Sequence, residues 1–239
     1  MKIETLPIRL WQPPRHPAFL FFLLLPLALL HGLGRDPDSD LAAAWLAQGL
    51  FRPLGNWAFP LLAMVLLLAG VMSWRHLRRH RESWGKPALY TVLEGCFWGW
   101  LLGPFLAWLT AWLPLERAPL ALWSLDRTLH HWAAAAGAGL YEELIFRGFM
   151  LGAGTLLLKR LFHSFGWGEG AASLAFGLAL ILSAAAFAFA HAFGDPRALE
   201  AQVFAFRALA GVFLGFLFAW RGLAVVAYTH ASYDLFLLS

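Results

Sequence analysis

Charged residues are scarce in this chain: Asp, Glu, Lys and Arg together make up 13% of its 239 residues. Soluble domains carry about 25% charged and about 45–50% apolar residues, whereas 60% of the residues here are hydrophobic. This shortage of charge excludes an ordinary soluble domain. A single cysteine, Cys96, excludes an internal disulfide framework and a thiol pair for redox or metal chemistry. The His-Glu-x-x-His pattern of zinc-binding helices does not occur either.

Long apolar runs account for most of the chain, and a helix of about 20 apolar residues can cross a membrane. The predicted fold is therefore all-α: a polytopic transmembrane helix bundle of seven to eight spans with one amphipathic interfacial helix. We place seven spans at residues 17–34, 55–74, 88–113, 138–160, 170–192, 202–220 and 222–238. The first run is long and lacks a small-x-small cleavage site, so we expect a retained span instead of a signal peptide.

Residues 120–137 are open to two interpretations. Their polar residues fall on one helical face and their apolar residues on another, which suits a helix lying in the membrane interface. The segment could also be an eighth span. We favour the flat helix, because four of its residues would be costly at bilayer depth: Asp126, Arg127, His130 and His131.

Membrane topology explains the net charge of +4 better than a nucleic-acid partner does, because the basic residues lie beside apolar runs. The densest basic group follows the second span: Arg75, Arg78, Arg79, Arg81 and Lys86. Cytoplasmic loops are enriched in Lys and Arg, so we place this loop and the amino terminus in the cytoplasm, and the chain in the bacterial inner membrane. With a flat helix, eleven basic residues fall inside and five outside; with an eighth span, the balance is ten against six.

Glycines recur every four residues at three places: Gly95, Gly99 and Gly103, then Gly148 and Gly152, then Gly211 and Gly215. Small residues at this spacing let helix backbones approach closely. The pattern predicts a tightly packed bundle and by itself says nothing about chemistry.

Two adjacent carboxylates and an arginine interrupt an apolar run at Glu142, Glu143 and Arg147. A charged side chain in hydrocarbon costs about 2.5–3.5 kcal/mol on insertion scales, so charges at this depth indicate function by default. In a helix, Glu143 and Arg147 share a face and can pair, whereas Glu142 points about 100° away. This spacing predicts one carboxylate that is neutralised by its partner and a second one that is available for chemistry.

Two later apolar helices also carry polar residues: His191 in one, and His230 with Asp234, four residues apart, in the other. A single intramembrane histidine is simply explained by a hydrogen bond to a neighbouring backbone. However, Glu142 lies near the start of its predicted span and His191 near the end of the next. Because consecutive spans are antiparallel, all these side chains fall toward the same membrane face.

Carboxylates and imidazoles at a common depth can activate water. The carboxylate takes a proton from water, and the imidazole orients the water or returns the proton to a leaving amine. Peptide hydrolysis also needs donors for the oxyanion; His230 can donate, and Asp234 can orient it or, when protonated, donate itself. Two other interpretations stay open: a zinc site with an open position for water, and the ion pathway of a transporter, although no internal repeat typical of transporters occurs.

The polar residues form three patterns, in this order over the last hundred or so residues: Glu142-Glu143-x-x-x-Arg147, Phe187-x-x-x-His191 and His230-x-x-x-Asp234. Together they resemble the three motifs of the CAAX-protease and bacteriocin-processing (CPBP, or Abi) family. Its members are glutamic-type intramembrane endopeptidases, also called type II CAAX prenyl endopeptidases. The resemblance implies that the paired charges of the first motif support the site: Glu143 and Arg147.

The resemblance also implies roles for four catalytic residues. Glu142 and His191 would activate the water, and His230 and Asp234 would form the oxyanion site. Family members more often carry Asn at the position of Asp234, which leaves its role as a donor the least direct of these assignments. The family is metal-independent, so no cofactor is expected, and zinc is the alternative.

The resemblance divides the chain into residues 1–115, transmembrane segments of unassigned type, and residues 116–239, the protease core. It implies a peptide hydrolase that acts among membrane lipids on a membrane-anchored protein or a lipidated peptide. With a flat helix over 120–137, the site opens toward the outer face, and exported proteins with a carboxy-terminal sorting signal become the expected substrates. The alternatives are a zinc-dependent prenyl endopeptidase and a non-enzymatic immunity or transport protein.

Overall fold

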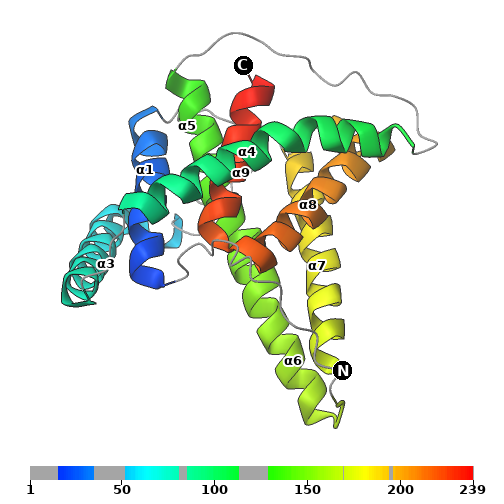
Figure 1. The fold of residues 1–239 in the computed structure, drawn as a ribbon, viewed down its shortest axis with the longest axis horizontal. Helices are drawn as coiled ribbons and strands as arrows, with labels where there is room; N and C mark the ends of the chain where they lie inside the picture. Colours follow the sequence, from blue (N-terminus) through cyan, green and yellow to red (C-terminus); the bar gives the residue numbers. More distant parts are fainter. Residues whose placement is uncertain are drawn as a thin grey trace.

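The computed structural model describes residues 16–34, 52–80, 85–112, 129–168, 170–193 and 196–238. All regular structure in these residues is helical, which confirms the all-α prediction for them (Figure 1). The elements are α1 Pro17–Gly34, η1 Arg52–Trp57, α3 Ala58–His80, α4 Gly85–Thr110, α5 Leu129–Gly137, η2 Ala138–Ala153, α6 Gly154–Ser164, α7 Ala171–Ala190, η3 His191–Phe193, η4 Pro196–Leu199, α8 Ala201–Arg221 and α9 Leu223–Leu238. The basic amino terminus and the first half of the expected interfacial helix lie outside the described residues.

Four of the described helices are long and apolar enough to cross a membrane: α1, α4, α7 and α8. The seven to eight spans that we expected are therefore not confirmed. α9 has only 16 residues, fewer than the 17–25 that a span usually needs. The helical run that begins at α5 carries the three charges of the first motif, and α3 ends in basic residues.

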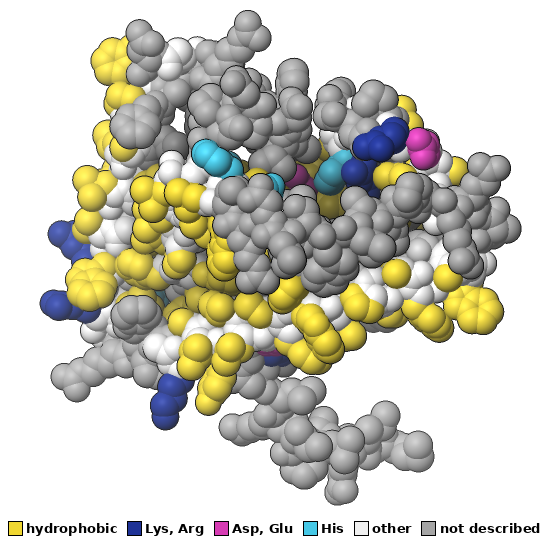
Figure 2. Space-filling model, turned by 90° about the horizontal axis from the view of Figure 1, so that it is seen from above, with side chains coloured by type: hydrophobic (Ala, Val, Ile, Leu, Met, Phe, Trp, Pro, Cys, Tyr) yellow, Lys and Arg dark blue, Asp and Glu magenta, His cyan; other side chains and the backbone are white. Residues whose placement is uncertain are grey.

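The outer surface of the bundle is apolar. Leu67, Phe149 and Leu157 are 68%, 73% and 67% exposed, and Figure 2 shows hydrophobic side chains over much of the face that it views. A soluble protein rarely exposes a large apolar patch, so these side chains suit contact with lipid. Together with the four apolar helices, this surface identifies an integral membrane protein.

α3 is longer than the span expected at 55–74. It continues to His80, so Arg75, Arg78 and Arg79 lie in its last turns and not in a loop. Cations are favoured at the carboxyl end of a helix, where the backbone carbonyls carry partial negative charge. The helix therefore continues through the basic residues, beyond residue 74, where the hydropathy pattern predicted its end.

Residues 129–164 form one continuous helical run, in which α5 leads into η2 and η2 into α6. The backbone stays right-handed at both junctions, with φ −65° and ψ −47° at Gly137 and φ −59° and ψ −45° at Gly154. The separate flat helix expected over 120–137 is thus not seen in its described half. Glu142 lies near the middle of a long helical rod and not near its start.

Contacts with α1 explain why α5 lies within the bundle. His31 Nδ1 is 2.9 Å from the carbonyl oxygen of Ala133, and His130 Nδ1 is 3.0 Å from that of Gly34. A Cβ on Gly34 would lie 2.7 Å from the Cβ of Ala133, so the two helices are in close contact. His130, which seemed costly at depth, has a hydrogen-bond partner inside the protein.

α4 packs along α9, the helix that carries the third motif. A Cβ on Gly99 would lie 2.6 Å from the carbonyl oxygen of Thr229 and 2.7 Å from the Cβ of Ser232. A Cβ on Gly95 would lie 3.1 Å from the carbonyl oxygen of Val225. The close helix approach predicted from the glycine spacing is confirmed at these two positions.

The other glycines differ in what they contact. A Cβ on Gly211 would lie 2.9 Å from the Cα of Ala184, so the prediction is confirmed between α8 and α7. A Cβ on Gly148 would meet only its own helix, at 3.8 Å, so no second helix approaches there. Gly139, which the spacing did not single out, faces α9: a Cβ would lie 2.7 Å from the Cβ of Ala231. This approach brings α9 against η2.

Gly99→Ala is expected to lower the free energy of unfolding by about 1–3 kcal/mol, because the added methyl group overpacks the contact between α4 and α9. Gly177→Ala is the matched control, since a Cβ on Gly177 meets nothing within 4 Å and alanine favours a helix over glycine by up to about 1 kcal/mol. Melting temperatures in detergent measure both changes. Equal melting temperatures for the two variants would contradict the tight contact.

Candidate active site

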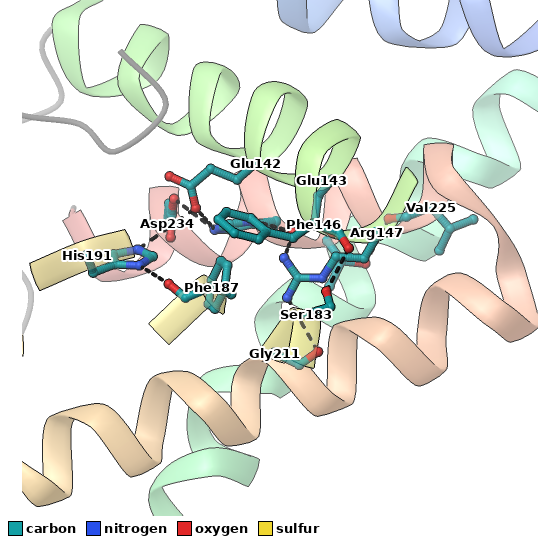
Figure 3. A network of polar contacts seen from close by, with 12 residues as sticks. Glu142, Glu143, Phe146, Arg147, Ser183, Phe187, His191, Gly211, Val225 and Asp234 are labelled. Atoms are coloured by element: carbon teal, nitrogen blue, oxygen red, sulfur yellow. Dashed lines mark hydrogen bonds and ion pairs between the residues drawn. The ribbon is translucent and has the colours of Figure 1, made fainter. Parts of the chain in front are cut away.

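The six polar residues of the predicted site lie together between η2, the end of α7 and α9. Figure 3 labels all of them except His230. Four of them are at most 4% exposed: Glu142, Glu143, Arg147 and His230. The side chains of the other two, His191 and Asp234, are 25% and 21% exposed. The site is therefore buried on the η2 side and opens where His191 and Asp234 lie.

Glu143 is the anchor of the buried charges. Its Oε1 accepts a hydrogen bond from Arg147 Nη1 at 2.8 Å and lies 2.7 Å from His230 Nδ1. The pair of Glu143 with Arg147, predicted from their spacing, is confirmed. Arg147 Nη2 also reaches the carbonyl oxygen of Gly211 in α8 at 3.4 Å. One carboxylate therefore links η2 to α9 and, through the arginine, to α8.

The backbone of η2 is π-helical. A π-helix bonds each N–H to the fifth residue before it, so its turns hold more residues than those of an α-helix. Successive side chains are then separated by less than the 100° that we expected, and two neighbouring carboxylates can flank one ring. Glu143 Oε1 lies at Nδ1 of His230, and Glu142 Oε2 lies 4.0 Å from its Nε2. Such π segments are frequent at functional sites.

Glu142 faces both imidazoles. Its buried Oε2 has no hydrogen-bond partner within the part of the chain that the structure describes. It lies 3.9 Å from Nε2 of His191 and 4.0 Å from Nε2 of His230. These distances exceed those of a direct hydrogen bond and suit one bridging water, which needs two to four polar partners.

The backbone of α7 orients His191. Its Nδ1 lies 2.8 Å from the carbonyl oxygen of Phe187, one turn earlier. A carbonyl oxygen only accepts, so Nδ1 carries a proton, and in the neutral ring the unprotonated Nε2 is the nitrogen that faces Glu142. The hydrogen bond to the backbone, which we named as the simple explanation for an intramembrane histidine, is thus present. It also determines that Nε2 is the nitrogen that faces Glu142.

His230 lies between carboxylates on both sides of its ring. Glu143 is at Nδ1, while Asp234 Oδ2 lies 3.5 Å from Nε2. Asp234 is also one turn along the same helix, as the spacing predicted. When the ring is protonated, its Nε2–H is a donor on the open side of the site. No group of three or more His, Cys, Asp or Glu side chains among the described residues is arranged to hold a metal ion.

Two arginines of α8 were not singled out from the sequence: Arg207 and Arg221. Arg207 lies in α8, half-buried, and is close enough for its charge to act on Glu142 and His191. Arg221 is buried and donates two hydrogen bonds to Glu94 of α4, at 2.5 and 2.7 Å. It directly precedes Gly222, whose φ of 87° turns the chain from α8 into α9. Both arginines carry the signal that marked Arg147, a cation within an apolar helix.

Residues 124–236 match a family model described as type II CAAX prenyl endopeptidase Rce1-like. The matched residues include all six polar residues of the site. This segment is similar to the Rce1-like family. The Rce1-like match confirms the resemblance drawn from the three motifs, and it does not extend to α1, α3 or α4. A search of the curated proteins finds no match, and neither does a search of the solved structures.

Proposed function

We propose that this protein is a glutamic-type intramembrane endopeptidase that hydrolyses a peptide bond in a membrane-anchored protein. The match to the Rce1-like family model supports protease activity, and the apolar helices support action within a membrane. The observation that carries the proposed mechanism is the position of Glu142 Oε2, buried and 3.9–4.0 Å from two imidazole nitrogens. A water between these atoms would be held by a base and oriented for attack.

The reaction proceeds by addition and elimination. Glu142 takes a proton from the water while the water oxygen bonds to the carbonyl carbon of the substrate. His191 Nε2 orients that water. The carbonyl oxygen becomes an oxyanion. The carbon–nitrogen bond then breaks, and the proton held at Glu142 passes to the leaving amine. The products are a new carboxylate and a new amino terminus.

His230 and Asp234 stabilise the oxyanion in this proposal. Nε2–H of the protonated His230 ring donates to it, and Glu143 holds the ring through Nδ1 at 2.7 Å. Asp234, 3.5 Å from Nε2, either orients the ring or, when protonated, donates directly. Removal of one oxyanion donor typically lowers kcat by about 10²–10³-fold.

Substitutions of Asp234 separate these two roles. Asp234→Asn is expected to keep or raise kcat, because the amide N–H₂ is a donor without needing a proton. Asp234→Leu is expected to lower kcat by about 10²-fold, because it removes the donor. Initial cleavage rates at saturating substrate measure both. If Asp234→Asn instead loses as much activity as Asp234→Leu, the carboxylate acts on His230 through its charge and not as a donor.

We propose that the reaction needs no metal. The experiment is cleavage of a membrane-anchored reporter by the purified protein in liposomes, with and without a strong chelator. The expected result is equal cleavage in both, with Glu142→Gln as the inactive reference. Loss of activity in chelator that zinc alone restores would favour the zinc-dependent alternative, in which the same carboxylate and imidazoles are ligands.

We also propose that the substrates are exported, membrane-anchored proteins, cleaved on the outer side of the membrane. α5 continues into η2 and α6 as one helical run, so it adds no crossing of its own, and this supports the orientation that we expected without an eighth span. Leu199 in η4 follows η3 on the open side of the site and is 57% exposed. Leu199→Cys in a Cys96→Ser background should react with a membrane-impermeant thiol reagent in intact cells. Reaction only after the membrane is opened would place the site on the cytoplasmic side and favour cytosolic lipidated tails.

A further inference from the structure

A stripe of polar and aromatic side chains runs along α7 at intervals of four residues: Ser183, Phe187 and His191. This spacing places them on one helical face, and the face lies against η2. Ser183 Oγ donates to the carbonyl oxygen of Phe146 at 2.6 Å, which holds α7 to the π-helical segment. Phe187 is the middle member and is 4% exposed.

The ring of Phe187 contacts charged and catalytic groups from three elements. The guanidinium carbon of Arg147 lies 4.3 Å from the ring centroid, within the range of a cation–π interaction. The rings of His191 and His230 lie 4.9 and 5.7 Å from it, centroid to centroid, both inclined by 68°. These are edge-to-face arrangements, which aromatic pairs favour. A purely apolar packing role would not require these polar partners.

The guanidinium depends on this ring for its orientation. Arg147 Nη1 bonds to Glu143, but Nη2 reaches its carbonyl partner only at 3.4 Å, and the buried Nε has no hydrogen-bond partner among the described residues. Hydrogen bonds therefore hold the guanidinium only in part, and the face of the Phe187 ring supplies a further contact. Since Arg147 and His230 share the same oxygen of Glu143, a turn of the guanidinium would also move the imidazole.

We propose that Phe187 is a positioning residue: its ring holds the Arg147 guanidinium and both catalytic imidazoles in one geometry, while its carbonyl sets the tautomer of His191. The inference rests on the proposed hydrolytic function of the site. Substitution of the side chain removes the ring and leaves the carbonyl, so the two contributions are separable. The reacting water is then held less well, although every group that touches it is still present.

The experiment compares two buried phenylalanines of nearly equal exposure. Phe187→Leu is the test, and Phe19→Leu is the matched control, because Phe19 is 3% exposed and packs in a cluster of α1 with Leu23 and Leu77. Both variants lose the same ring, and only one loses it at the site. The readouts are kcat and KM for the membrane-anchored reporter, together with the melting temperature.

The expected result is a fall in kcat of about 10²-fold for Phe187→Leu with little change in KM, since a small misplacement of catalytic groups has an effect of this size. Phe19→Leu should lower the melting temperature and leave kcat within about twofold. Phe187→Tyr, which keeps the ring, should recover most of the lost kcat. Phe187→Met fills a similar volume without a ring, so it replaces Phe187→Leu as the test if Phe187→Leu does not fold.

Equal kcat for Phe187→Met and the parent protein, measured below both melting temperatures, would overturn the proposal. So would equal losses in Phe187→Leu and Phe19→Leu. Failure of the proposed function gives a different result: either the parent protein does not cleave the reporter, or Glu142→Gln cleaves it as fast as the parent, or cleavage is lost in chelator and restored by zinc.

Discussion

Glu142→Gln is expected to abolish hydrolysis while the bundle stays folded. The amide keeps the shape and burial of the side chain but cannot take a proton from water. General-base catalysis contributes about 10²–10⁴-fold, so the residual rate should fall by at least about 10²-fold. The rate of reporter cleavage in liposomes measures the loss, and the melting temperature shows that folding is retained.

Glu200→Gln is the control for this substitution, because Glu200 is exposed at the start of α8 and has no part in the proposed reaction. It should leave the cleavage rate unchanged. The result also separates the classes of function considered from the sequence. A protein that acts only as an immunity or scaffolding factor would keep its activity in Glu142→Gln, and retained cleavage by this variant would rule out the glutamic mechanism.

The second large effect is on stability. Arg147→Met is expected to lower the free energy of unfolding by about 3–5 kcal/mol, because the buried carboxylate of Glu143 loses its arginine and keeps only His230 as a partner. Glu143 and Arg147 are both 0% exposed, so water cannot compensate for the loss. Thermal unfolding in detergent measures the change. Arg160→Met, an exposed arginine in α6, should change stability by no more than about 0.5 kcal/mol.

The double variant Glu143→Gln/Arg147→Met tests the physical reason. Removal of both charges eliminates the buried carboxylate that has lost its arginine, so much of the stability lost in Arg147→Met should return. Activity should not return with it, because His230 no longer has a carboxylate at Nδ1. If the double variant is less stable than Arg147→Met, the pair is not the unit that the contacts indicate.

Patterns of residue type and spacing singled out six polar residues that the structure brings together. Glu143 and Arg147 were paired correctly from a four-residue interval, since side chains at this interval are neighbours on a helix. Counting antiparallel spans predicted that His191 and His230 lie at one depth with Glu142. The three side chains do lie together, although Glu142 is near the middle of its helical run and the span count is not confirmed. The roles assigned to these residues come from the family resemblance and await the substitutions above.

Other contacts could not be predicted, because they depend on how the helices are placed. The pairing of Arg221 with Glu94 joins residues 127 positions apart, and no local pattern links them. The contact of His31 with Ala133 holds α5 against α1, so a segment whose polar residues suggested the membrane surface lies within the bundle. Local composition reports the cost of burying a polar group but not whether a partner is present.

The sequence by itself determined that this is a helical membrane protein with carboxylates and imidazoles in its apolar helices, because hydropathy and helical spacing are properties of neighbouring residues. Only the tertiary structure decided that η2 is π-helical, that both Glu142 and Glu143 face His230, and that Phe187 lies against Arg147. The reason is physical: such contacts depend on the packing of η2, α7 and α9 against one another, and these elements are far apart in the chain.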